Sequence, residues 1–379
     1  MSQLNILIVT SSFYPATIYG GPIFSVFHLC KALANLGHSV SVVSANPDGL
    51  KRLQVKTGEW LESYGNFRIK FYNDTVIGRF SFSMMLKLMF DIKRNQVVHS
   101  QDIMSTTNLW STVYAILLGK PVIVSPRGKL SAWSLSQKSR GKRLWLHWTV
   151  RFFASRLYFH ATSIEEANDV AKSIPNNRKT FVVPNIINIP ELSADTTALS
   201  DKYNYPFILG MGRLHKKKGF DILIEAFSLL EDHQETKLII AGSDEGELEY
   251  LTSLCKAGGL EDKVCITGEV SGDEKLFLLA NAKVFALPSH SENFGMVYAE
   301  SLALGTPIIA SIHTPWKEAA DAGCGYWINN TAVEFAEALR EILNKGKEIY
   351  SDNCRQFAHR FSPEVVGARM AEVYAEIAK

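Results

Sequence analysis

Two glutamates, Glu292 and Glu300, lie in the segment of this sequence with the clearest chemical character. Glu292 falls in a polar loop after an apolar run, and Glu300 about one turn inside a helix that we expect to begin near Gly295. The backbone N–H groups at the start of such a helix favour an anionic phosphate. They belong to Phe294, Gly295 and Met296. The two carboxylates can accept hydrogen bonds from sugar hydroxyls on either side of that phosphate.

A second segment supplies positive charge. Gly212, Arg213 and Lys218 follow a predicted strand at 207–210 and precede a predicted helix. Arginine offers a planar fork of donors and lysine a point charge, a combination suited to a diphosphate. Because a departing nucleoside diphosphate gathers negative charge, fixed cations stabilise it most in the transition state. The sequence has no Asp-x-Asp motif and no carboxylate–histidine cluster, so we expect neither a metal nor a cofactor.

Short apolar runs alternate with helix-period segments around these residues. The run at 6–9 predicts a strand covered on both faces, and 23–36 predicts a helix. Further strands are predicted at 39–44, 67–71, 96–99, 122–125 and 181–183, and a second series at 207–210, 238–241, 264–267, 284–287 and 307–310. The polar stretch 191–204 separates the series. The pattern predicts an α/β fold of two doubly wound, Rossmann-like domains, 1–195 and 205–360, facing a central cleft that binds the ligands.

With these segments in view, the sequence resembles the retaining glycosyltransferases of the group 4 family, which have the GT-B fold. The E-x7-E pair matches at Glu292 and Glu300, and the pattern G-R-L-x-x-x-K-G matches at 212–219. Gly20-Gly21 after the first strand also matches. Ser-Pro-Arg-Gly at 125–128 is common in the branch that builds bacterial surface polysaccharides. The likeness covers essentially the whole chain.

The resemblance implies a role for each matching residue. Arg213 and Lys218 would bind the diphosphate of the donor, and Glu300 would bind the ribose hydroxyls. Glu292 and the backbone of residues 294–296 would hold the transferred sugar. The remaining donor contacts would come from Gly20 and Gly21, which line the cleft, and from Gly242, Glu269 and Val270 near the nucleotide base. Family members need no metal, and their acceptor attacks from the face that the diphosphate leaves. Their last helix, here 362–379, usually packs on the N-terminal domain.

Three residues are candidates for polar contacts on the acceptor side. Arg127 stands where many relatives carry a histidine, so a histidine's role cannot be carried over to it. His99 and His160 fall near predicted strand ends facing the cleft. Each is either a site residue or a structural histidine with internal partners.

The stretch 127–156 holds eight lysines and arginines, interleaved with aromatic residues, and has no acidic residue. The membrane patch that we predict in it consists of Trp133, Lys138, Arg140, Lys142, Arg143, Trp145 and Trp148. Basic side chains among interfacial aromatics are typical of a surface that meets anionic lipid. A charged face above an aromatic core stripe is the alternative interpretation.

The bulk composition narrows the class of protein. A formal net charge of +2 gives no whole-molecule attraction to nucleic acid. The five cysteines are scattered without a C-x-x-C pair, which fits a reducing cytosol. We expect no signal peptide and no membrane-spanning segment, hence a cytoplasmic protein that is either free in the cytosol or peripheral on the inner face of the plasma membrane.

Together these features predict a retaining, metal-independent hexosyltransferase. It would move a hexose or an N-acetylhexosamine from a UDP- or GDP-sugar to a growing, lipid-linked bacterial surface glycan such as the lipopolysaccharide O-antigen, capsule or exopolysaccharide. The alternatives are a non-catalytic sugar-nucleotide-binding subunit and a sugar-nucleotide epimerase of the same fold. The sequence leaves the nucleotide base, the sugar, the acceptor and the oligomeric state open.

Overall fold

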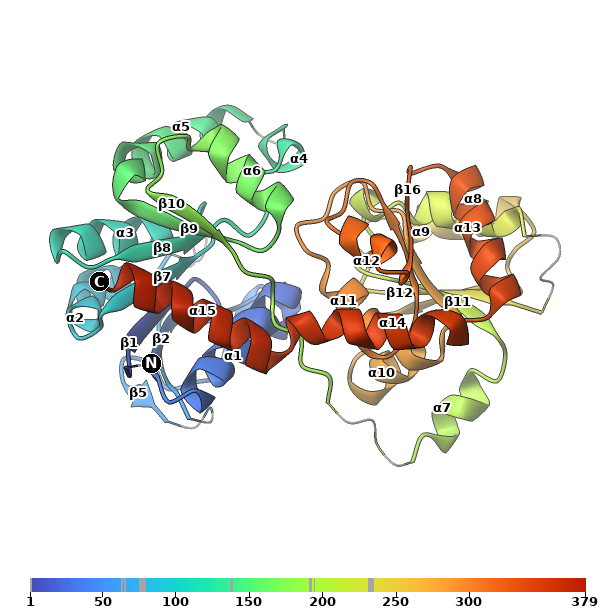
Figure 1. The fold of residues 1–379 in the computed structure, drawn as a ribbon, viewed down its shortest axis with the longest axis horizontal. Coiled ribbons are helices and arrows are strands. Elements are labelled where there is room, and N and C mark those ends of the chain that lie inside the picture. The colour runs from blue at the N-terminus through green and yellow to red at the C-terminus, as the bar shows by residue number, and fades with distance from the viewer. Residues whose placement is uncertain are drawn as a thin grey trace. The chain divides into compact units, whose positions relative to one another are not determined.

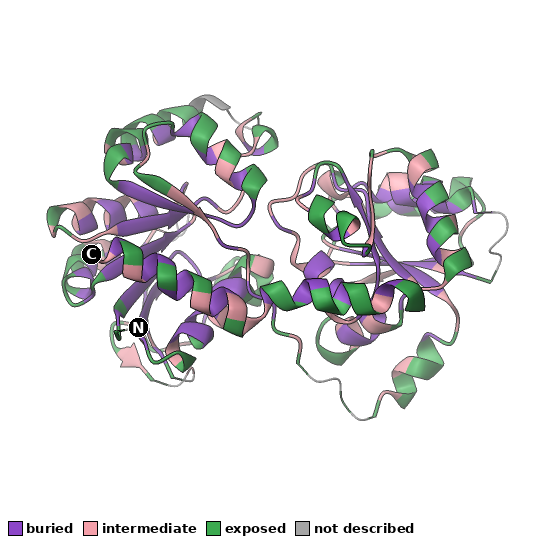
Figure 2. Cartoon of the chain, in the orientation of Figure 1, coloured by how far each residue is buried: buried purple, intermediate pink, exposed green. Residues whose placement is uncertain are grey.

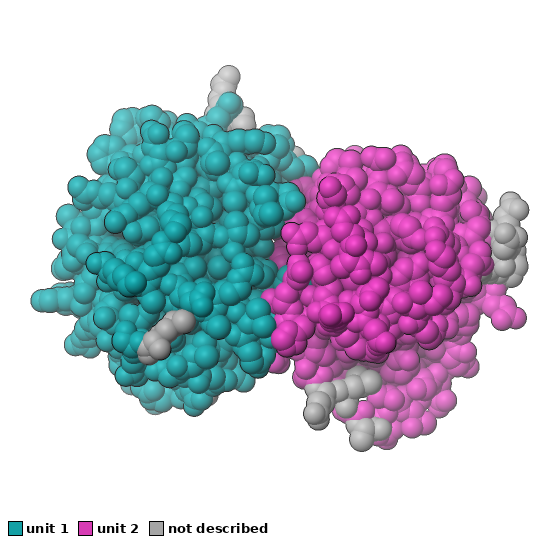
Figure 3. All heavy atoms as spheres, viewed as in Figure 1, with its two compact units in different colours: residues 1–187, 361–379 teal, residues 188–360 magenta. Residues whose placement is uncertain are grey.

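The structure is a computed structural model that describes residues 2–62, 64, 66–74, 80–136, 139–190, 193, 195–230 and 235–379, with only the backbone described at 139 and 140. The chain divides into two compact units, which are residues 1–187 with 361–379, and residues 188–360 (Figure 3). Each unit is a largely parallel sheet packed between helices (Figure 1). This confirms the predicted α/β class and the two Rossmann-like domains.

The sheet of unit 1 has the strand order β10-β9-β8-β7-β1-β2-β6-β5. Neighbouring strands pair in parallel except β5 and β6. Its strands are β1 (Asn5–Thr10), β2 (Ser39–Ala45), β5 (Trp60–Leu61), β6 (Arg68–Tyr72), β7 (Val97–Gln101), β8 (Val122–Ser125), β9 (Leu157–Ala161) and β10 (Lys179–Val182). A separate antiparallel pair consists of β3 (Pro47–Asp48) and β4 (Lys51–Arg52).

Both faces of this sheet are buried, as the continuous apolar run in β1 predicts (Figure 2). Ile6 and Ile8 join one core with α1 (Gly21–Asn35) and the C-terminal helix α15 (Pro363–Ile377). Leu7 and Val9 join the other core, to which four helices contribute. These are α2 (Phe82–Lys93), α3 (Thr106–Leu117), α5 (Ser139–Thr149) and α6 (Ile164–Ser173). Shorter helical turns are η1 (Thr17–Tyr19), α4 (Ala132–Ser136), η2 (Arg151–Arg156) and η4 (His359–Phe361).

The sheet of unit 2 is parallel throughout, in the order β13-β12-β11-β14-β15-β16. Its strands are β11 (Phe207–Met211), β12 (Lys237–Ala241), β13 (Val264–Gly268), β14 (Val284–Leu287), β15 (Ile308–Ser311) and β16 (Gly325–Ile328). Helix α8 packs against α9 and α13, and α11 packs against α10 and α14. The helices are α7 (Thr197–Lys202), η3 (Lys216–Lys218), α8 (Phe220–Ser228), α9 (Leu248–Ala257), α10 (Gly272–Asn281), α11 (Met296–Ala303), α12 (Lys317–Asp321), α13 (Ala332–Lys345) and α14 (Glu348–Ala358).

The structure contains elements that the sequence pattern did not predict. β9 is fully buried, but it has the sequence Leu-Tyr-Phe-His-Ala and follows the basic stretch, so it lacks the β-branched character of its neighbours. β16 is a half-buried edge strand that starts with glycine. The short helix α7 lies inside the stretch that we expected to be a linker.

Candidate functional site

β11 and β14 are neighbours in the sheet of unit 2, and the strand order reverses between them. Ligands bind at such a switch point in open α/β sheets, beyond the carboxyl ends of the strands. Residues 212–219 leave the carboxyl end of β11, and residues 288–295 leave that of β14. The two segments meet there, since the backbone N–H of His290 donates to the carbonyl of Lys217 over 2.8 Å. The fold therefore brings both chemically distinctive segments of the sequence to one edge of the sheet.

Lys218 and Glu292 form an ion pair between these two segments. The side chains are 17% and 10% exposed, so the pair is largely withdrawn from water. Ser289 Oγ donates to the same carboxylate oxygen over 3.1 Å. Burial by itself raises the pKa of Glu292, but Lys218, Lys217 and the hydrogen bonds more than offset it, and the net pKa lies below its ordinary value. Glu292 is therefore ionised, and it holds the Lys218 ammonium at the switch point.

Arg213 is placed differently. Its side chain is 63% exposed and pairs with Glu245, with 2.6 Å between Nη1 and Oε1. An exposed ion pair of this kind contributes little to stability, so the guanidinium can exchange Glu245 for a ligand at small cost. Nothing in the spacing of the sequence predicts this partner, because Glu245 lies in the loop after β12.

The start of α11 is a rigid loop with glycine at its centre. Gly295 caps the helix with φ +78°, and a Cβ there would lie 2.7 Å from the ring of Tyr298. Trp316 Nε1 donates to the carbonyl of Phe294 (2.7 Å), and the Tyr298 hydroxyl donates to the carbonyl of Leu287 (2.7 Å). These bonds fix the helix start that the sequence predicted. The first N–H groups of a helix lack the usual acceptor four residues earlier; here that of Tyr298 donates to the carbonyl of Gly295 (3.1 Å). Met296 is the first residue of the helix.

Glu300 lies on α11, one turn beyond its start, and its carboxylate pairs with Lys275 of α10. Lys275 Nζ lies 2.8 Å from Oε1 and 2.7 Å from Oε2. Each carboxylate oxygen has two lone pairs, so capacity remains to accept bonds from two hydroxyls. Sequence reasoning missed Lys275, because it has no fixed spacing from Glu300 and only the packing of α10 on α11 brings it there.

The residues predicted to lie near a nucleotide base follow the strands on one side of the switch point. Gly242 follows β12, and a Cβ there would lie 1.8 Å from the carbonyl oxygen of Gly212, so only glycine permits this approach. Glu269 is exposed and Val270 is half-buried, and both follow β13.

In unit 1, Gly20 and Gly21 begin α1, with Gly20 at the N-cap. Arg127 lies just beyond β8, where its guanidinium donates to Gln101, Ser25 and Asn185. Both features lie at the carboxyl end of the unit 1 sheet, since α1 follows β1.

His99 and His160 differ from the expectation that they offer acceptor-side contacts. They are 0% and 2% exposed. Ser125 Oγ lies between them, 2.7 Å from His99 Nε2 and 2.9 Å from His160 Nδ1. The outer nitrogens bond to the hydroxyl of Tyr374 on α15 (2.6 Å) and the carbonyl of Val183 (2.8 Å). Every ring nitrogen has an internal partner, so we assign both histidines to the attachment of α15.

The predicted membrane patch separates into outward and inward side chains. Trp148 is 64% exposed, and Arg143 is exposed. Trp133 is 37% exposed. Lys142 Nζ instead donates to the carbonyl of Ser134, and half-buried Trp145 donates to that of Ile103. Lys138 and the side chain of Arg140 lie outside the described residues.

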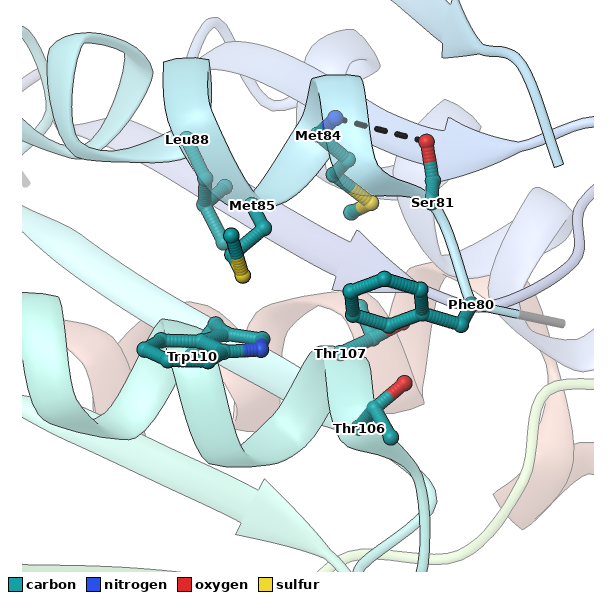
Figure 4. A pocket seen from close by; sticks show the side chains of 8 residues that line it. All are labelled: Phe80, Ser81, Met84, Met85, Leu88, Thr106, Thr107 and Trp110. Carbon is teal, nitrogen blue, oxygen red and sulfur yellow. Dashed lines mark hydrogen bonds between the residues drawn. The ribbon is translucent and has the colours of Figure 1, made fainter. Parts of the chain in front are cut away.

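A small apolar cavity of unit 1 lies between α2 and α3 (Figure 4). It is lined by residues such as Met84, Met85 and Trp110, and its volume of about 10 Å³ has room for about one water molecule. In the described parts of the chain, no three His, Cys, Asp or Glu side chains are grouped to hold a metal ion. No described helix is long and apolar enough to cross a bilayer.

Two family models match the chain. Residues 19–190 match glycosyltransferase family 4, and residues 197–360 match glycosyl transferases group 1. The second match contains the Lys218–Glu292 pair and Glu300.

Curated relatives match shorter stretches. A D-inositol 3-phosphate glycosyltransferase of Xylanimonas cellulosilytica is 29% identical over 58% of this chain and 57% of its own length. A mannosylfructose-phosphate synthase of Agrobacterium fabrum is 39% identical over 28% of this chain and 25% of its own length. The chain thus spans less than two thirds of either relative.

A solved structure, Anabaena HepE in complex with UDP and glucose, matches with a TM-score of 0.76 at 18% identity. The match covers 99% of this chain and 100% of HepE, so it extends the likeness of fold to the full length. The two family matches place this chain among the glycosyltransferases, with a family 4 domain followed by a group 1 domain. The structural match shows the GT-B fold.

Proposed function

We propose that this protein transfers a hexose or an N-acetylhexosamine from a nucleotide-diphosphate sugar to an acceptor, with retention of the anomeric configuration and without a metal ion. The observation that carries the proposal is the ion pair of Lys218 and Glu292 beside the start of α11, at the switch point of unit 2. A cation, a carboxylate and the N-terminus of a helix form a site that can bind a sugar phosphate.

Each group has a task in this reaction. Lys218 and Arg213 stabilise the charge that develops on the diphosphate as the glycosidic bond to it breaks. The first turn of α11 adds backbone donors and the positive end of the helix dipole. Glu292 accepts hydrogen bonds from hydroxyls of the transferred sugar, and Glu300 accepts them from the ribose. The nucleotide base of the donor packs against Gly242, Glu269 and Val270. The complex of HepE with UDP and glucose supports a donor of this chemical class.

A thermal-shift screen of the full chain against UDP, GDP, ADP and their common sugars, with and without EDTA, tests the donor site. A ligand that binds only the folded state raises the melting temperature. We expect a shift with one nucleotide family that EDTA does not remove. No shift with any nucleotide would refute the donor site, and a shift that disappears in EDTA would refute metal independence. The anomeric proton of the product, followed by NMR, reports whether the configuration is retained.

For the acceptor, we propose a growing, lipid-linked bacterial surface glycan. The segment Ser125-Pro126-Arg127-Gly128 supports this class through the family resemblance. Incubation with a labelled donor and membranes of a surface-glycan producer should label material that extracts into organic solvent. Label found only in water-soluble products would contradict a lipid-linked acceptor.

The outer face of α5 and η2 supports a position on the inner surface of the plasma membrane. Leu144, Trp148 and Phe152 are 61%, 64% and 72% exposed and recur every four residues. Exposed arginines at 143, 151 and 156 accompany them. Large apolar side chains beside basic ones bind anionic lipid through burial and charge together.

Vesicle flotation tests this surface. The wild type should float with phosphatidylglycerol vesicles and not with phosphatidylcholine vesicles, and a Leu144→Ser/Trp148→Ser variant should lose most of the binding. Reversal of charge at Arg143 to Glu should weaken it further. Equal flotation of the wild type and the double variant would place the contact elsewhere, and no flotation of the wild type would remove the membrane from the proposal.

A further inference from the structure

The guanidinium of Arg127 has only neutral hydrogen-bond partners among the described residues. Nε donates to Gln101 Oε1 over 2.9 Å. Nη1 donates to Asn185 Oδ1 over 2.8 Å and to Ser25 Oγ over 3.3 Å. Within the described ranges, Nη2 has no partner and no carboxylate lies within 4.0 Å of the group. Arg127 is partly withdrawn from water, so its positive charge lacks part of its hydration. This costs free energy unless an anion binds to the guanidinium.

The carboxylates nearest to Arg127 are engaged elsewhere. Glu166 accepts from the N–H of Gly128 (2.8 Å) and from the N–H and hydroxyl of Thr162 (2.7 and 2.9 Å). Asp102 Oδ1 accepts from the N–H of Met104 (3.1 Å). Burial lowers the pKa of Arg127, and these two carboxylates oppose that shift only from a distance. Glu166 and Asp102 therefore lower the positive potential around Arg127, but neither is hydrogen-bonded to its guanidinium.

Helix α1 adds a second positive field at the same place. Ser25, which accepts from Arg127, lies in its second turn, and the N-cap is Gly20. The first turn of α1 has no acidic residue, and its N-cap residue makes no side-chain capping bond. Pro22 has no N–H, and the N–H of Ile23 donates to the carbonyl of Gly20 (3.0 Å), so the helix contributes mainly through its dipole. A helix N-terminus carries about half a positive charge. A guanidinium next to an uncapped helix N-terminus is repelled by it, and an anion that contacts both removes the repulsion.

Gln101 supplies an unused donor. Arginine can only donate, so the bond from Arg127 Nε fixes Gln101 with its oxygen toward Arg127 and its amino group away from it. The side chain is 3% exposed, and Nε2 has no hydrogen-bond partner among the described residues. A buried donor without an acceptor is destabilising, and native structures keep few of them. An oxygen of a bound ligand would satisfy it.

The backbone around these side chains is held in an unusual conformation. Gln101 ends β7 and Ser125 ends β8, which are paired neighbours. Shortly after these ends, Asp102 and Arg127 have φ values of +66° and +56°. Residues with a side chain rarely adopt such values, and where they do the strain is often tied to a functional position.

We propose that Arg127 and Gln101, with the first turn of α1, bind an oxyanion, a carboxylate or phosphate group carried by the acceptor or by the transferred sugar. The site gives the enzyme a preference for an anionic substrate over its neutral analogue. The description of the ligand as a substrate rests on the proposed function, whereas the binding of an oxyanion at this place does not.

Calorimetric titration of the full chain with inorganic phosphate and with glucuronate measures the binding directly. Any binding at the unit 2 site is common to all variants, so the comparison between variants isolates Arg127. We expect Arg127→Gln to lose at least about tenfold in affinity and Arg127→Lys to lose less, because a charge remains without the fork. Gln101→Met, which keeps the size and removes the amino group, should lose several-fold. Arg178→Gln is the matched control, since this exposed arginine of unit 1 stacks on Tyr158.

The source of the oxyanion follows from a second comparison. If the transferred sugar carries it, Arg127→Gln lowers the affinity for the UDP-linked uronic acid and leaves that for UDP-glucose unchanged. If the acceptor carries it, the variant raises KM for an acidic or phosphorylated acceptor and leaves the binding of both donors unchanged. Phosphate and glucuronate affinities that are equal in the wild type, Arg127→Gln and Gln101→Met would overturn the proposal. The nucleotide screen is independent of this result, so loss of one proposal leaves the other standing.

Discussion

Unit 1 and unit 2 each hold a group of hydrogen-bonded polar side chains, largely withdrawn from water, near the carboxyl ends of their strands. The two groups differ in how much hydrogen-bonding capacity remains for a ligand. In unit 2, Lys218 and Glu292 are ionised and lie beside the start of α11. In unit 1, hydrogen bonds connect Tyr374, His99, Ser125 and His160 to the carbonyl of Val183. That carbonyl can only accept, so His160 Nε2 donates to it. Burial lowers the pKa of both histidines, so both rings are neutral, and each group in the series then donates to the next.

The difference shows how a structural polar cluster can be told from a ligand site. In the series of unit 1, every histidine ring nitrogen is hydrogen-bonded to another protein group, and the bond to Tyr374 attaches α15 to the sheet. The pair in unit 2 carries formal charges, has carboxylate lone pairs available to a ligand, and lies beside a helix N-terminus. A group that still has bonding capacity can bind a ligand, and one whose capacity is spent can only support the fold. The comparison therefore predicts activity effects for the Lys218–Glu292 pair of unit 2 and stability effects for the histidine series of unit 1.

The largest effect is expected for Lys218→Ala. It removes the cation that stabilises the departing diphosphate, so kcat should fall by about 10³-fold, as when one preorganised donor to a developing charge is lost. The variant should remain folded, although Glu292 loses its counter-charge. Steady-state kinetics, with circular dichroism to check the fold, measure both quantities.

Lys216→Ala is the matched control for that variant. Lys216 lies in the same turn η3, and its side chain is exposed. Its kcat should remain within about twofold of the wild type, since a screened surface charge contributes little. Equal loss in the two variants would mean that only the general charge of the turn matters, and wild-type rates in Lys218→Ala would refute the diphosphate assignment.

A smaller effect, on binding rather than turnover, is expected for Glu300→Ala. It removes an acceptor of ribose hydroxyl bonds and leaves Lys275 without its partner, so donor affinity should fall by about 10- to 100-fold with a smaller change in kcat. Calorimetry with the bound nucleotide and its 2′- and 3′-deoxy analogues isolates the contact. The wild type should bind a deoxy analogue more weakly than the nucleotide itself, and Glu300→Ala should bind the nucleotide and its deoxy analogue with equal affinity. A deoxy penalty that survives in the variant would assign the ribose to another residue.

The sequence predicted the parts of this molecule that depend on local order. The start of α11 at Gly295 and the carboxyl end of β11 both follow from neighbouring residues. What it could not predict depends on contacts between distant segments. Tyr374 is 275 positions from His99, so nothing near His99 indicates that its Nδ1 is already bonded. The partners Glu245 and Lys275 were missed for the same reason. A sequence shows that a histidine lies near a strand end, but it does not show whether the ring nitrogens are already hydrogen-bonded within the protein.

Tyr374→Phe should affect stability alone. It removes the hydroxyl at the end of the buried series and leaves His99 Nδ1 without a donor, at a cost of about 1–3 kcal/mol in the free energy of unfolding. Urea denaturation measures that loss, and kcat and donor affinity at a temperature where the variant is folded should stay at wild-type values. A change in donor affinity without a change in stability would return the histidine series to the functional site.

The same series also produces a dependence of stability on pH. Burial and the charge of Arg127 lower the pKa of His160 to about 3, and burial lowers that of His99 as well. An unfolded histidine titrates near 6.5, so below that pH the unfolded chain takes up protons that the folded chain does not bind. The free energy of unfolding therefore falls as pH falls from about 6.5 toward about 3, by about 1.4 kcal/mol per pH unit for each such histidine.

Urea titrations between pH 7 and 5 measure this slope, and His160→Gln should reduce it by about one proton. The amide can still bond to Ser125 and Val183 but does not titrate, so the slope changes while the series is largely kept. His147→Gln is the control, because that residue is exposed on α5. If His160→Gln and the wild type have the same slope, His160 binds a proton in the folded state. The series would then carry a charge, and the contrast between a neutral chain in unit 1 and a charged pair in unit 2 would fail.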